Sequence, residues 1–334
     1  MKSVIPPCLG PDPEVSQPGW TVPPGAWDTH FHVLGPTSQY PYAATRKYTP
    51  PDAPLDACLA MHNALGIDRG FVVHANTHGF DNRVDIDAVT GSQGRYLAVV
   101  RLGEGTTADE CRRLHAAGAR GVRFAFNPQH GGTLDKTVFS HVLECIEGLG
   151  WFVNLHFDGA SLPGLEDWIA SIPATVVIDH MGRIDPSLGL DQLPFQALTR
   201  LAARSNIWVK LTGADRISKV GPPYSDVVPF ARRLADLAGD RLLWGSDWPH
   251  TGYFDAARMP DPGKRHLDGK VASLCGWRYD RGVHLCRPRR ASGLRRGQHC
   301  PDRGRSADAG RQKGTDPHVA LASRRRGTGR CRPR

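Results

Sequence analysis

The chain has 334 residues, of which 40% are apolar, and it carries a formal net charge of +9. This length and apolar content allow a large buried core, in one α/β domain or two smaller ones. No segment has the length of a membrane span and the first residues lack the apolar stretch of a signal peptide, so a membrane or secreted protein is not expected. The eight cysteines are scattered without a Cys-x-x-Cys pair, which favours a reduced protein of the cytoplasm.

The charge is divided unevenly along the chain. Residues 264–334 contain 20 of the 42 Lys and Arg and 5 of the 33 Asp and Glu, a net charge of +15. The first 263 residues carry 22 basic and 28 acidic residues, a net charge of −6. The basic charge therefore belongs to the tail and does not indicate what the body of the protein binds.

The N-terminal part predicts an arm and then a strand with two histidines. Residues 1–25 are rich in Pro and Gly and predict an arm on the surface. The run Trp27–Val33 predicts the first strand, in which His30 and His32 point to the same face because side chains alternate along a strand. Two imidazoles held together suit a metal ion or a carbonyl oxygen that needs polarisation, although a lone His-x-His pair also occurs by chance in ordinary strands.

The rest of the body alternates strand-like and helix-like segments. After a long loop, apolar residues at helical spacing predict a helix over Leu55–Leu65 that ends at Gly66. Short apolar runs predict strands at Gly70–His74, Tyr96–Leu102, Gly121–Phe124, Trp151–Leu155, Thr175–Asp179, Ile207–Leu211 and Leu242–Trp244. Amphipathic stretches predict helices at Ala108–Ala117, Lys136–Leu149, Leu193–Ala203 and Val227–Ala238. Apolar strands that alternate with helices indicate a parallel sheet, so residues 26–263 are predicted to form an α/β fold, a closed (β/α)₈ TIM barrel.

Ionisable residues crowd the C-terminal ends of the predicted strands, where the active sites of such barrels lie. They are His74, Arg123, His156, Asp158, Asp179, His180, Arg183, Lys210, Asp215, Arg216, Asp247 and His250. Because these strand ends surround one mouth, we expect many of the side chains to meet at a single site.

Three of the strand ends carry motifs of a known family. The motifs are Asp28–His32, Val177–Arg183 and Leu243–His250. Together they resemble the amidohydrolase superfamily. Within it, the segments His74–Arg83 and Gly213–Arg216 are similar to the branch of 2-pyrone-4,6-dicarboxylate hydrolases and sulfomuconolactone hydrolases. The resemblance runs from about Ala26 to about Pro262 and implies a role in the degradation of aromatic compounds.

The resemblance also implies a reaction. In this branch water opens a lactone ring, and the matching residue for the general base is Asp247. The histidines His30, His32 and His180 would surround the carbonyl oxygen, which gains negative charge as the tetrahedral intermediate forms. A different interpretation of Asp247, as the cap of a following helix, fits less well because Trp248-Pro249 delays a helix start.

The resemblance leaves the metal content open. The pyrone-dicarboxylate hydrolases are metal-free, whereas many relatives hold one zinc or a similar ion. In the metal-dependent case, the expected ligands of the zinc ion are His30, His32, His156, His180 and Asp247. In the metal-free case, His156 is a neutral hydrogen-bonding side chain of the pocket.

Arginines indicate the substrate class. Arg123, Arg183 and Arg216 follow strand ends and can converge on one mouth, where planar guanidinium groups pair with carboxylates or sulfonates. A small anionic lactone is therefore the expected substrate, although each arginine could instead pair with a neighbouring Asp. Further binding residues are expected at Tyr48, Thr77 and His78. Residues 126–130 lack an arginine that the pyrone-dicarboxylate enzymes are expected to have, which argues against pyrone dicarboxylate itself.

Two other functions stay open at this point. A decarboxylase of the same superfamily would act on an aromatic acid through the same His and Asp set and would need a metal. Alternatively, the arginines of residues 264–334 could bind the phosphates of a nucleic acid. That tail has few aromatic residues and no nucleic-acid motif, so the enzyme is the favoured hypothesis.

The family resemblance stops where the composition changes. Residues 264–334 contain no Glu, Ile, Phe, Asn or Met and do not supply the amphipathic helix that should follow the eighth strand. We therefore predict that the last helix is defective or missing and that this tail is a frameshifted sequence of low order. Translating the nucleotides after codon 263 in the other two frames should reveal a helix rich in Leu, Ala and Glu. If neither frame does so, and the purified chain melts cooperatively with its tail protected from protease, the tail is genuine.

Overall fold

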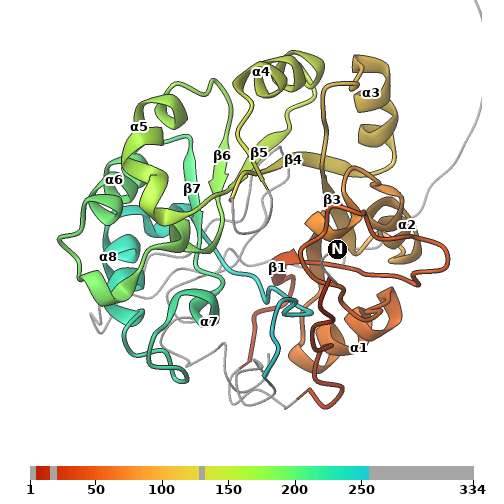
Figure 1. The fold of residues 1–334 in the computed structure, drawn as a ribbon, viewed down its shortest axis with the longest axis horizontal. Coiled ribbons are helices and arrows are strands. Elements are labelled where there is room, and N and C mark those ends of the chain that lie inside the picture. Colours follow the sequence, from red (N-terminus) through yellow and green to blue (C-terminus); the bar gives the residue numbers. More distant parts are fainter. Residues whose placement is uncertain (1–4, 16–20, 128–131, 256–334) are drawn as a thin grey trace, which may run out of the picture. The chain divides into compact units, whose positions relative to one another are not determined.

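Parallel strands form one sheet in which each strand pairs with the next along the chain (Figure 1). They are β1 (Trp27–Phe31), β2 (Arg69–Val73), β3 (Tyr96–Val100), β4 (Ala119–Ala125), β5 (Phe152–His156), β6 (Val176–Ile178), β7 (Ile207–Lys210) and β8 (Leu242–Leu243). This computed structural model describes residues 5–15, 21–127 and 132–255. Each strand overlaps the apolar run that predicted it.

Hydrogen bonds between β1 and the segment after β8 close the sheet into a barrel. The Thr29 amide donates to the Trp244 carbonyl oxygen at 3.0 Å, and the Asp247 amide donates to the His30 carbonyl oxygen at 2.8 Å. The predicted (β/α)₈ TIM barrel is therefore confirmed. The closing bonds also place the backbones of His30 and Asp247 side by side, although the two residues lie at opposite ends of the barrel sequence.

Helices follow the strands and cover the outside of the barrel (Figure 1). They are α1 (Leu55–Leu65), α2 (Arg83–Gly91), α3 (Ala108–Ala116), α4 (Lys136–Cys145), α5 (Leu162–Ala170), α6 (Leu193–Ala202), α7 (Ala214–Ile217) and α8 (Val228–Ala238). The first predicted helix ends as expected at Gly66, whose φ of 75° lies in the left-handed region that favours glycine. The short helices α2, α5 and α7 lie outside the amphipathic stretches that the sequence singles out.

Both faces of the strands are buried, as the apolar runs predicted. Every residue of β1, β5 and β6 is buried. The outer faces pack against helices such as α8, which buries Phe230 and Leu234. Because the strands are rigidly enclosed, the polar residues at their C-terminal ends are held in place for a site at one mouth of the barrel.

The described part of the predicted arm lies along the first loop of the barrel. The Cys8 amide donates to the Thr49 carbonyl oxygen at 3.0 Å, and the Thr49 amide donates to the Pro6 carbonyl oxygen at 2.8 Å. A further bond joins the Leu9 amide to the Tyr253 carbonyl oxygen at 2.8 Å. The arm therefore connects the first loop with the segment that follows β8.

The predictions for the end of the chain lie outside the described residues. After β8 the described residues continue to Asp255 and contain no helix. The predicted absence of a closing helix, the frameshifted tail and its hypothetical binding of nucleic acid all concern residues 256–334. In the described part of the chain, no helix is long and apolar enough to cross a membrane.

Candidate active site

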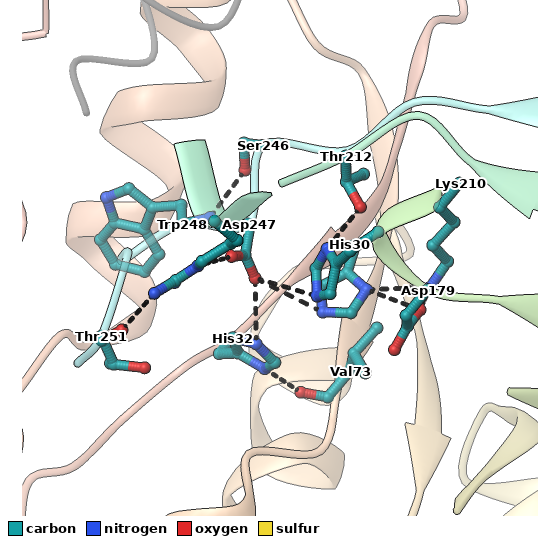
Figure 2. Close-up of polar contacts among 12 residues, drawn as sticks. His30, His32, Val73, Asp179, Lys210, Thr212, Ser246, Asp247, Trp248 and Thr251 are labelled. Carbon is teal, nitrogen blue, oxygen red and sulfur yellow. Dashed lines mark hydrogen bonds and ion pairs between the residues drawn. The ribbon is translucent and has the colours of Figure 1, made fainter. Parts of the chain in front are cut away.

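Three histidines and one aspartate meet at the C-terminal end of the barrel (Figure 2). His30 belongs to β1 and His32 follows it directly, while His180 opens the short helix η4 (His180–Arg183) after β6. Asp247 lies in the segment after β8. The Nε2 atoms of the three histidines lie 3.5, 3.6 and 4.0 Å from Asp247 Oδ1. The structure thus brings the four predicted catalytic side chains together around one oxygen atom.

Each ring is held through its Nδ1 atom, on the side away from Asp247 (Figure 2). His32 Nδ1 lies 2.6 Å from the Val73 carbonyl oxygen, and His180 Nδ1 lies 2.7 Å from Thr212 Oγ1. Because a carbonyl oxygen only accepts hydrogen bonds, His32 Nδ1 donates the proton, and the neutral ring then has a lone pair on Nε2.

This arrangement fits a metal ion. His32 Nε2 lies 3.6 Å from the Asp247 carboxylate, and a proton or a metal ion between these two atoms would bring them together favourably. His30 Nε2 is buried and makes no hydrogen bond to any described residue. Donor atoms of His30, His180 and Asp247 lie within 4.8 Å of one another, so they could hold one ion. Imidazole and carboxylate donors suit zinc.

A second carboxylate, Asp179, anchors the cluster from below. Its Oδ1 lies 3.2 Å from His30 Nδ1 and 3.1 Å from Lys210 Nζ, and its Oδ2 accepts from Arg123 Nη2 at 3.3 Å. Burial alone would raise the pKa of Asp179, but Lys210, His30 and Arg123 hold that pKa well below its usual range. Lys210 also donates to Asn154 Oδ1 at 2.7 Å. Lys210 and Arg123 therefore share one buried carboxylate beside His30.

Arg216 pairs with the predicted base. Its Nε donates to Asp247 Oδ2 at 2.8 Å, and its Nη1 donates to the Thr251 carbonyl oxygen at 2.6 Å. Burial alone would raise the pKa of Asp247, but Arg216 and His180 hold it well below its usual range. Burial also lowers the pKa of His180, to about 4. The resting site at neutral pH therefore contains an ionised Asp247 and a neutral His180.

The backbone around these residues is locally strained. His180, Arg183 and Asp247 have φ values of 51°, 51° and 56°, in the left-handed region that residues other than glycine seldom adopt. Such conformations cost about 1 to 3 kcal/mol each and persist where the surrounding structure over-determines them, often at functional sites. Position 213 requires glycine for a steric reason, because a Cβ atom there would lie 2.7 Å from His180 Nδ1.

A cavity of about 400 Å³ opens above the histidines and is rich in positive charge. Its cationic side chains are Arg46, Lys47, Arg101, Arg123, Arg183 and Arg216. Its carboxylates are Asp215, Asp247 and Asp255. Burial and the nearby Arg216 charge lower the pKa of Arg183, whose guanidinium makes no hydrogen bond or ion pair to the described residues. The cavity therefore offers charge that an anionic ligand would neutralise.

The remaining predicted residues are only partly brought to this cavity. Tyr48 and Thr77 line it, and the Tyr48 hydroxyl is hydrogen-bonded with Thr251 Oγ1 at 2.7 Å. His78 does not line it, because its ring packs against Tyr42 with 4.9 Å between ring centres. Burial of the His78 ring lowers its pKa to about 4.

His156 has a peripheral place in the site. It lines the cavity, and its ring centre lies 5.6 Å from that of His180. It is not part of the close donor group formed by His30, His180 and Asp247. Of the five predicted metal ligands, three form the close group; His32, whose Nε2 lies 3.6 Å from Asp247 Oδ1, and His156 are not part of it.

The comparison with known families agrees with this geometry. The amidohydrolase family profile matches residues 27–263, more than half of the chain. The chain belongs to the amidohydrolase family. The resemblance identified from the three motifs is thereby confirmed, and the match covers the strands and all four residues around the Asp247 oxygen.

Relatives of this amidohydrolase include named lactone hydrolases. It is 53% identical over 260 residues to a 4-sulfomuconolactone hydrolase of Rhizobium radiobacter. The aligned region covers 78% of this chain and 87% of the relative. It is 40% identical over 257 residues to a 2-pyrone-4,6-dicarboxylate hydrolase of Comamonas testosteroni. This aligned region covers 74% of this chain and 84% of the relative.

Solved structures share the fold of this amidohydrolase. An apo crystal structure from Agrobacterium tumefaciens matches with a TM-score of 0.65 and 29% identity, over 77% of this chain and 97% of the other. A probable 2-pyrone-4,6-dicarboxylic acid hydrolase from Acinetobacter baumannii, crystallised with citric acid bound, matches with a TM-score of 0.63 and 25% identity, over 75% and 95% of the two chains.

Sequence reasoning did not place several residues that this amidohydrolase brings to the site. Asp179 and Lys210 were noted at strand ends, but their joint contact with His30 depends on side chains from three different strand ends. Arg101 lies inside the apolar run Tyr96–Leu102, directly after β3 ends at Val100. A charged residue at the end of an otherwise apolar run was the signal that could have identified Arg101.

Proposed function

We propose that this amidohydrolase hydrolyses the ring ester of a small anionic lactone. The observation that carries the proposal is the convergence of three imidazole Nε2 atoms on Asp247 Oδ1 at the floor of a cavity rich in arginine. An ester carbonyl at this floor would meet electrophilic groups and a base at once. The names of the relatives, which are lactone hydrolases, support this function.

In the proposed mechanism, Asp247 removes a proton from a water molecule while the water oxygen bonds to the lactone carbonyl carbon. The carbonyl oxygen becomes negatively charged, and the His cluster lowers the energy of this tetrahedral intermediate. The bond between that carbon and the ring oxygen then breaks, and the ring oxygen takes up the proton from Asp247. The products are a hydroxyl group and a carboxyl group on one opened chain, and the carboxyl group loses its proton to the solvent at neutral pH.

We propose further that His30, His32, His180 and Asp247 hold one divalent ion, with zinc as the expected metal. The neutral state of His180 and the Nδ1 contacts of all three rings are what imidazole ligands require. Such an ion would supply Lewis acidity for the carbonyl oxygen. Asp179 and Thr212 orient His30 and His180 through the ring atoms that face away from the centre.

Arg183 is the best candidate for a direct contact with an anionic group of the lactone. The structure pairs Arg216 with Asp247 and Arg123 with Asp179, so these two arginines already have carboxylate partners. Arg183 has no such partner among the described residues, and a planar guanidinium binds a carboxylate or sulfonate with two parallel hydrogen bonds. Tyr48 and Thr77 could add neutral hydrogen bonds from the wall of the cavity.

A panel of substrates tests the proposed function. We expect the purified chain to hydrolyse lactones that carry a carboxylate or sulfonate, and to act poorly on neutral lactones because the arginine charge would stay unpaired. Aromatic carboxylic acids are assayed in parallel for loss of carbon dioxide. Decarboxylation of these acids without any lactone hydrolysis would show that the chain is the alternative enzyme of the superfamily.

A further inference from the structure

Arg101, like Arg183, is a cation of the cavity that forms no ion pair with the described residues. It follows β3 directly and lines the cavity. Within the described residues its guanidinium makes no hydrogen bond and no ion pair, whereas Arg123 and Arg216 each contact a carboxylate. Transferring a cation into a partly buried place without a counter-charge is costly, so an unpaired guanidinium at a cavity wall calls for an explanation.

The position of Arg101 is nevertheless defined by its neighbours. The Asn82 side chain bonds to both backbone groups of Arg101, accepting from its amide and donating to its carbonyl oxygen, each at 2.8 Å. The guanidinium carbon lies 4.5 Å from the ring centre of Phe80, a cation–π contact that covers one face of the group. The edge of the guanidinium, which carries its N–H donors, is not used by this contact and stays available for a ligand.

The surroundings of Arg101 have an excess of positive charge. Burial lowers its pKa, and the nearby charge of Arg123 lowers it further. Asp179, the carboxylate that contacts Arg123, also contacts Lys210. A bound anion would therefore relieve repulsion between Arg101 and Arg123 in addition to forming its own hydrogen bonds.

The location of Arg101 separates it from Arg183. Around the barrel, two strands lie between β3 and β6 in one direction and four in the other, so Arg101 and Arg183 approach the mouth from well-separated sides. Arg101 also borders a second cavity of about 610 Å³, whose lining includes Glu104, Glu110 and Asp135. Those carboxylates would repel an anion, so an anionic group is expected to stop at Arg101 rather than enter the second cavity.

We propose that Arg101 is a specificity-determining residue that binds a second anionic group, a carboxylate or a sulfonate, on the far side of the lactone from Arg183. The inference rests on the proposed lactone hydrolysis and adds to it the residue that would bind a second anionic group of the substrate. Phe80 is assigned as the residue that holds the guanidinium in position. Neither residue touches the reacting ester, so both act on binding and not on the chemical step.

The test compares two lactones with the same ring, one with two anionic groups and one in which the second group is replaced by a neutral amide. For Arg101→Met we expect KM for the dianion to rise by about ten- to hundredfold, the usual effect of losing a charge-assisted pair, with kcat nearly unchanged. KM for the amide should stay close to that of the wild type. Arg101→Lys should restore part of the difference, because it keeps the charge without the planar fork.

Controls separate this inference from the proposed function. Phe80→Leu should raise KM for the dianion by less than Arg101→Met does. Arg113→Met, on the exposed face of helix α3, should leave KM unchanged for both lactones. If Arg101→Met changes KM equally for both lactones, or changes KM for neither, the proposed role of Arg101 is overturned. If the wild-type chain opens neither lactone, the proposed function itself fails. Melting temperatures of all variants, measured beside the wild type, identify any loss through unfolding.

Discussion

Replacing Asp247 with asparagine is expected to lower kcat for lactone hydrolysis by at least about a hundredfold, the usual scale for losing a general base. The amide keeps the size of the side chain and can still bond to Arg216, but it cannot accept the proton of the attacking water. Burial disfavours the charged form, yet Arg216 and His180 hold the pKa of Asp247 well below its usual range, so the wild-type base is ionised throughout the neutral pH range. The deficit should therefore be independent of pH in that range.

The matched control for this variant is Asp236→Asn on the exposed face of α8, which should leave kcat unchanged. Steady-state rates are measured with an anionic lactone at saturating concentration, and circular dichroism verifies that both variants are folded. Near-normal turnover by the Asp247→Asn chain would show that another group accepts the proton.

Removing bound metal is expected to have an effect of similar size. Protein purified without chelator should contain about one divalent ion per chain, held by the donor group of His30, His180 and Asp247. Treatment with a chelator should lower kcat by about a hundredfold or more, because a Lewis acid at the carbonyl oxygen contributes several kcal/mol to the transition state. Adding zinc back should restore the rate.

Two variants make the metal result specific. His180→Asn removes a donor of the close group and should lower both the metal content and the rate, whereas His156→Asn should leave the metal content nearly unchanged because His156 lies outside that group. Metal is quantified by elemental analysis of each preparation beside its rate. A fully active sample with metal content near zero would contradict the metal proposal and place the chain with the metal-free hydrolases.

Much of the fold could be predicted because its signals are local. An apolar run of a few residues that must be buried on both faces is visible in the sequence, and so is the helical spacing that produced α1 and its end at Gly66. Helix α3 was predicted although it has nine residues, like α2 and α5. Helix α2 was not predicted because Val84-Asp85-Ile86-Asp87 alternates apolar and polar residues, and α5 was not because Pro163-Gly164 interrupts its pattern. Helix α7, with four residues, is shorter than any helical pattern that a sequence can show.

Some features of the candidate site were also visible in the sequence because they are local. The sequence by itself determined the residue types at the strand ends and the alternation along β1 that directs His30 and His32 to one side, because strand geometry requires only neighbouring residues. Membership of the amidohydrolase family was likewise visible in three short motifs and is confirmed by the match over residues 27–263.

Only the tertiary structure decided which charges pair with which. Arg216 contacts Asp247 and Arg123 contacts Asp179, while Arg101 and Arg183 have no such partner among the described residues. The sequence does not show which of these four arginines has a carboxylate partner, since each stands near or shortly after the C-terminal end of a predicted strand. An ion pair depends on distances of a few ångströms between side chains from different strands, and barrel closure, crossover packing and rotamers fix those distances together. Which arginines pair with a carboxylate of the site, and which have no such partner among the described residues, is therefore decided only by the folded barrel.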